Sequence, residues 1–127
     1  MLRLAGAVSG GLATWIVLVT LLNFGLRTAL PGYHAAEPTF AFTLTMMIGR
    51  LAIAMLTSLA AGAVVRAIAP GSDFAPWVVG IALLALFVPV HVQIGARLPL
   101  WYHLAFLLTL APLVWAGARF KRSAVRA

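Results

Sequence analysis

The sequence predicts an all-α protein made of four transmembrane helices in an antiparallel up-and-down bundle. Of the 127 residues, 64% are hydrophobic and 9% are charged, whereas a soluble domain has about a quarter charged residues. The apolar residues fall into four long segments, at about 4–26, 39–66, 74–95 and 99–118. Such a chain cannot cover a water-facing surface, so we expect a single integral membrane domain over residues 1–127.

Each of the first two segments is long enough to cross a hydrocarbon core of ~30 Å at about 1.5 Å per residue. The first lies between Arg3 and Arg27. Its apolar part is longer than the core of a secretory signal peptide, so we expect a retained span. The second follows a loop bracketed by Pro31 and Pro38. It is longer than a span requires, so it should tilt or project from the membrane.

The third and fourth segments are separated by breaker residues of the kind that form turns. Pro70 to Asp73 precedes the third segment, and Gly95 to Pro99 precedes the fourth. Pro89 and Pro112 lie inside these segments, where each removes one backbone hydrogen bond and predicts a kink.

The basic residues predict the orientation. One side of the four-span arrangement collects Arg3, Arg66, Arg119, Lys121, Arg122 and Arg126, and the other has only Arg27 and Arg97. The positive-inside rule places both termini in the cytoplasm, in a bacterial inner (plasma) membrane. The basic tail, residues 119–127, then faces anionic lipid headgroups. The net charge of +7 is explained in this way, and we expect no nucleic-acid partner.

Arg50 lies in the middle of the second segment, where an arginine costs roughly 2.5–3.5 kcal/mol to insert. Counted from residue 39 it is 11 residues in, which is roughly 16 Å deep. The two acidic residues, Glu37 and Asp73, are not at a matching depth. We therefore expect a polar centre within the bundle or a bound anion. The candidate partners are Thr14, Thr109, a carbonyl freed near Pro112, a folded-back Glu37, and an acid of another subunit.

Polar residues gather toward the outer face: His34, Glu37, His91, His103, Asn23 and Gln93. His91 and His103 come from neighbouring segments at similar depth and could face each other. A metal, haem or proton-handling site is one interpretation, and ordinary contact with headgroups and water is the other. The histidines lack the spacing of metal ligands, and metal sites use at least three protein ligands. We expect no metal and no cofactor.

Small residues recur every four positions in the first two segments. Gly6, Gly10 and Thr14 form one stripe, and Ala54, Ser58 and Gly62 form the other. Such stripes let helix backbones approach closely. We expect the first and second segments to pack on each other here, with a second copy of the chain as the alternative partner.

The predicted spans contain few polar residues, and this scarcity limits the functional hypotheses. No catalytic constellation is present, and the chain has no cysteine, so thiolate chemistry and disulfides are excluded. The first hypothesis is a non-enzymatic accessory or structural membrane subunit. The second is a small oligomeric transporter or channel in which Arg50 attracts anions. The third is a redox or quinone-handling subunit that uses His91 and His103.

Overall fold

The computed structural model describes residues 2–39 and 41–126, without the side chains of 121–126. Helices are the only regular secondary structure among these residues. The four long ones are α1 (Leu2–Ala29), α3 (Leu44–Ile68), α4 (Ala75–Ile94) and α5 (Leu100–Arg126); α2 (Tyr33–Ala36), η1 (Glu37–Thr39) and η2 (Gly95–Arg97) are short. Each long helix is long and apolar enough to cross a membrane. The all-helical prediction is confirmed to that extent.

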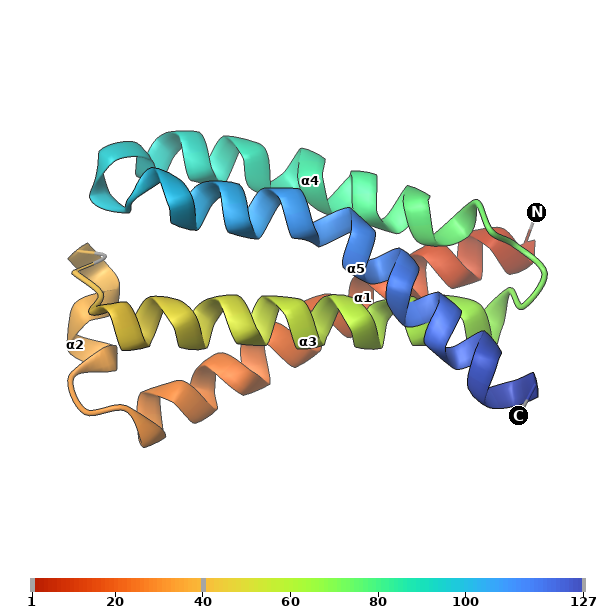
Figure 1. Cartoon of the computed structure of the whole chain (residues 1–127), viewed down its shortest axis with the longest axis horizontal. Helices are drawn as coiled ribbons and strands as arrows, with labels where there is room; N and C mark the ends of the chain where they lie inside the picture. Colours follow the sequence, from red (N-terminus) through yellow and green to blue (C-terminus); the bar gives the residue numbers. More distant parts are fainter. Residues whose placement is uncertain (1, 40, 127) are drawn as a thin grey trace.

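The long helices lie lengthwise beside one another (Figure 1). Both chain ends lie at one end of the bundle, here called the terminal end, and α2 and the α4–α5 connection lie at the other, the α2 end. Helix α3 packs against α1 and α5, and α4 packs mainly against α5. Figure 1 also shows that α1 is beside α4 at the terminal end and diverges from it toward the α2 end.

Helix α3 begins later than the sequence predicts. Thr43 is extended (φ −73°, ψ 168°) and its hydroxyl accepts a hydrogen bond from the Met46 N–H, which is the arrangement of an N-cap. Residues 37–39 instead form the 3₁₀ turn η1. Arg50 therefore follows the helix start at Leu44 by six residues, or ~9 Å. Within α3, Arg50 lies nearer the beginning of the helix than the middle, because the cap places the helix start at Leu44.

Glycine permits the closest helix contacts. A Cβ on Gly62 would overlap the carbonyl of Val114 in α5, and a Cβ on Gly117 would overlap the backbone of Leu59 in α3. Gly10 packs against side chains of α3, as the first stripe predicts. Gly62 packs on α5 and not on α1, so that part of the stripe prediction is wrong. The reason is that α3 lies between α1 and α5 and needs small residues toward both.

Pro89 and Pro112 lie inside α4 and α5. Figure 1 shows that α5 changes direction along its length, and an interior proline is the usual cause of such a bend. The core beneath is continuous and includes Trp15, Leu83 and Tyr102, so the described helices share one hydrophobic interior.

Candidate functional site

Arg50 is held by two tyrosine hydroxyls. Its Nε donates to Tyr102 Oη at 3.0 Å, and its Nη1 donates to Tyr33 Oη at 2.7 Å. The Tyr33 hydroxyl in turn donates to Asn23 Oδ1 at 3.0 Å. The guanidinium carbon lies 4.8 Å from the centre of the Phe42 ring, within the range of a cation–π contact. No carboxylate of the described residues forms an ion pair with this cation.

The Arg50 guanidinium is only partly saturated. It carries five N–H donors, of which the two tyrosines take one each. The other three have no hydrogen-bond partner among the described residues. A half-buried cation with free donors and no neutralising charge is a site for a hydrogen-bond acceptor that carries negative charge.

The loop between α1 and α3 supplies Tyr33. Gly32 has φ +80°, a left-handed conformation that glycine adopts without strain, and the chain turns there so that Tyr33 is fully buried. The Tyr33 ring stacks on Phe42 at 5.4 Å. Burial raises the pKa of the Tyr33 hydroxyl above its ordinary value, and the Arg50 cation opposes this shift. Tyr33 is therefore a neutral phenol at physiological pH.

An ion pair fastens the same loop to α1. Arg27 donates to Glu37 through Nε at 2.6 Å and Nη2 at 2.9 Å, and His34 Nδ1 lies 3.6 Å from the same carboxylate. The hydrogen bond from Arg27 lowers the pKa of Glu37 below its ordinary value. Glu37 thus positions the loop that carries Tyr33, and it does not fold back onto Arg50.

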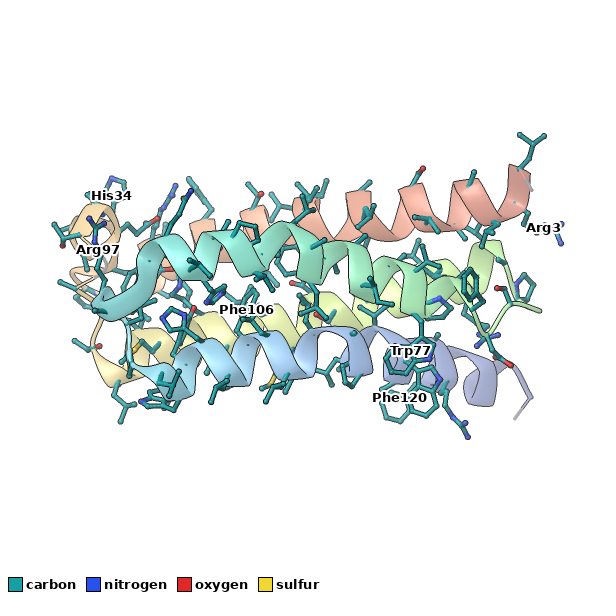
Figure 2. The ribbon with its side chains drawn as sticks, turned by 90° about the horizontal axis from the view of Figure 1, so that it is seen from above. Arg3, His34, Trp77, Arg97, Phe106 and Phe120 are labelled. Atoms are coloured by element: carbon teal, nitrogen blue, oxygen red, sulfur yellow. The ribbon has the colours of Figure 1, made fainter. Side chains whose placement is uncertain are left out.

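A cavity of about 180 Å³ lies against Arg50. Residues of α1, α3, α4 and α5 line it. Figure 2 shows Phe106, which borders the cavity, in the half of the molecule that also carries His34 and Arg97. The walls of the cavity combine aromatic and polar side chains. The aromatic residues are Trp15, Phe87 and Phe106, and the polar residues are Asn23, Arg50, His91 and Tyr102.

The structure brings His91 and His103 together. Their Nδ1 atoms are 2.6 Å apart, and His103 Nε2 lies 2.9 Å from the Gly95 carbonyl oxygen. His91 is buried and lines the cavity. The pair therefore connects the cavity with the α4–α5 connection.

The other predicted residues lie apart from this site. The Thr109 hydroxyl donates to the Ala105 carbonyl of its own helix at 2.6 Å, and the half-buried Thr14 makes no hydrogen bond with Arg50. His34 and Gln93 are exposed at the α2 end. The partners of Arg50 are thus Tyr33 and Tyr102, which are not among the candidates that the sequence predicts. A signal for both was present in the sequence. Tyr33 shortly precedes the helix that carries Arg50, and Tyr102 lies near the start of the last predicted span, which begins at the same end of the bundle.

No family model matches the chain, and no curated protein or solved structure matches it either. Fold and site define a helical bundle whose long helices are apolar enough for a membrane, with a cationic, aromatic-walled cavity near its α2 end. No three His, Asp or Glu residues of the described part are grouped to hold a metal ion. The donors at the cavity suit hydrogen bonding to an organic acid.

Proposed function

We propose that this protein is an integral membrane protein of four antiparallel spans that binds a small amphipathic organic acid at Arg50. The observation that carries the proposal is the half-buried guanidinium with three free N–H donors beside a cavity. Both termini are cytoplasmic in a bacterial inner membrane, as the basic residues indicate. The α2 end and the cavity then lie in the outer half of the bundle.

A second arginine, the buried Arg66, shows how this chain satisfies a cation within its own fold. Arg66 donates from Nε to the Ala118 carbonyl at 3.3 Å, from Nη1 to the Pro70 carbonyl at 2.8 Å, and from Nη2 to Asp73 at 3.0 Å. Three of its five N–H donors are thus used, one on each nitrogen, and a carboxylate balances its charge. Arg50 has neither feature, which supports a ligand in place of the missing partner.

The cavity supports a ligand with one apolar ring. A cavity of roughly 150 Å³ lined by apolar residues accommodates benzene, and this one is about 180 Å³. Trp15, Phe87 and Phe106 provide the aromatic wall, and Arg50 receives the acidic oxygen atoms. Amphipathic acids accumulate in the bilayer, which would supply the ligand to a cavity among the membrane-spanning helices.

This function is binding without chemical turnover. It fits the hypothesis of an accessory subunit, and it gives Arg50 the anion-attracting role of the transporter hypothesis. Transport would in addition require a path to the cytoplasmic side. Flux of a bound acid into vesicles would identify a carrier, and saturable binding without flux would identify an accessory binding protein.

Benzoate tests the proposal, with benzamide as the neutral ligand of matched shape. Binding is measured by calorimetry on the protein in phosphatidylcholine nanodiscs, which contain no competing anionic lipid. We expect saturable benzoate binding at least tenfold tighter than benzamide binding, a difference of about 1.4 kcal/mol. Arg50→Gln should abolish the difference. Arg97→Gln, which removes an exposed charge at the same end, should preserve it.

Two results would overturn the proposal. One is the absence of benzoate binding to the unaltered protein. The other is equal preference for benzoate in Arg50→Gln and in the unaltered protein, provided that both show the same thermal unfolding transition.

A further inference from the structure

We infer that His91 and His103 form the proton acceptor of the Arg50 site, so that the acid enters neutral and is held as an anion with its proton on the histidine pair. This inference rests on the proposed function and specifies its ligand as a weak acid. It is carried by the hydrogen-bond chain of the two imidazoles and by the cavity that His91 shares with Arg50.

The hydrogen-bond chain fixes the tautomers of the two neutral rings. A carbonyl oxygen only accepts, so the hydrogen between His103 Nε2 and the Gly95 oxygen belongs to His103. His103 Nδ1 is then an acceptor. The hydrogen between the two Nδ1 atoms, 2.6 Å apart, therefore belongs to His91. It follows that His91 Nε2 carries a lone pair and no hydrogen.

That lone pair is available to a ligand. His91 Nε2 has no hydrogen-bond partner among the described residues, and His91 lines the cavity. Nor is this nitrogen sealed in the protein, because the only fully enclosed side-chain N or O atom without a partner in the described part is Thr57 Oγ1. Arg50, which has free donors, and His91, which has a free base, thus both line the cavity; a carboxylic acid needs a donor for its carbonyl oxygen and an acceptor for its hydroxyl group.

The proton transfer is balanced within the site. The O–H bond of the acid breaks, the proton forms an N–H bond with His91 Nε2, and the electron pair stays on the carboxylate against Arg50. His91 then passes its Nδ1 hydrogen to His103 Nδ1, which places the added charge nearer the α4–α5 connection. The pair gains one proton, and nothing is oxidised or reduced.

Electrostatics couples the binding of the acid at Arg50 to the uptake of a proton by the histidine pair. The charged or titratable groups that face His91 are Arg50 from α3 and Tyr102 and His103 from α5. Helix α1 contributes uncharged residues to the cavity, namely Trp15, Val19 and Asn23. In the empty cavity the Arg50 cation opposes a second positive charge on His91. A bound carboxylate cancels that charge, so the pair takes up a proton only when the site is occupied.

Proton uptake is measured by benzoate calorimetry at pH 7 in buffers that differ in ionisation enthalpy. Benzoate is an anion in solution, so we expect about one proton taken up per benzoate bound. Its affinity should fall about tenfold per pH unit above neutrality, as one linked proton requires. His91→Gln should still bind benzoate through Arg50, with uptake near zero and a flat pH profile. His34→Gln, which changes an exposed histidine outside the cavity, should behave as the unaltered protein does.

Nitrogen-15 NMR of the unaltered, histidine-labelled protein gives an independent measurement that does not depend on a variant folding. We expect one neutral Nδ1–H ring without benzoate, and an imidazolium signal when benzoate saturates the site. Benzoate binding with no proton uptake and unchanged histidine signals would overturn the inference and leave the Arg50 binding site intact. Absence of benzoate binding would instead overturn the proposed function.

Discussion

Replacing each tyrosine of the Arg50 site by phenylalanine should destabilise the protein unequally. Tyr102 Oη accepts one hydrogen bond, from Arg50. Tyr33 Oη accepts one from Arg50 and donates one to Asn23. Both side chains are buried, Tyr33 at 0% and Tyr102 at 2% exposure, so phenylalanine retains the packing and removes only the hydroxyl.

The magnitudes follow from the number and type of bonds lost. A hydrogen bond to a charged group contributes roughly 1.5–3 kcal/mol, and a neutral one about 1 kcal/mol. Arg50 borders a cavity in which water can replace a lost partner, so the lower value applies. We expect Tyr102→Phe to reduce the free energy of unfolding by about 1.5 kcal/mol and Tyr33→Phe by about 2.5 kcal/mol.

A double-mutant cycle with Arg50→Leu isolates the interaction. Once Arg50 is absent, Tyr102→Phe removes a buried hydroxyl that has lost its partner, and it should be neutral or stabilising. The coupling free energy between Arg50 and Tyr102 should therefore be at least about 1.5 kcal/mol. Reversible unfolding of the purified protein in mixed detergent micelles provides the measurement. A coupling below about 0.5 kcal/mol, the ordinary error of additivity, would refute this account of the site.

Three further predictions concern other parts of the molecule. Gly62→Ala forces a Cβ onto the α5 backbone and should lower unfolding stability by about 1–3 kcal/mol, whereas Gly25→Ala, which faces open space, should leave it equal or slightly higher. Thr57→Val removes a buried hydroxyl without a partner and should raise the unfolding temperature; a drop would show that the hydroxyl is satisfied. Glu37, whose folded-state pKa lies below its ordinary 4.5, stabilises the loop fully above that value. Resistance of residues 30–43 to proteolysis should therefore fall as the pH drops through the folded pKa, and Glu37→Gln should show low resistance at every pH.

The sequence predicts the four long helices because their length and apolarity are local properties. The sequence does not predict the start of α3, because residues 39–43 are as apolar as a membrane span. The helix begins at Leu44 because the Thr43 side chain caps it there through a hydrogen bond from the Met46 N–H. Arg50 consequently lies nearer the α2 end than its place in the apolar run indicates.

The partners of Arg50 depend on tertiary structure. Tyr33 reaches Arg50 only because the chain turns at Gly32 and the Arg27–Glu37 ion pair fastens the loop. Tyr102 lies two residues after the start of α5, and its position near the end of a predicted span indicates an aromatic residue at the membrane–water interface. The contact between His91 and His103 is more accessible to sequence reasoning, because a short connection joins two helices and places their adjoining ends together.

The chemical type of these partners determines what the site does. A carboxylate beside Arg50 would satisfy the cation and cancel its charge, as Asp73 does for Arg66. A phenol accepts a hydrogen bond without adding charge, and burial raises the pKa of Tyr33, so this residue remains neutral. Two tyrosines therefore fix the orientation of the guanidinium and leave its positive charge uncancelled and three of its donors free. Apolar side chains would stabilise the same bundle at least as well, so the presence of an unpaired cation here supports the proposal that the site binds an anionic group.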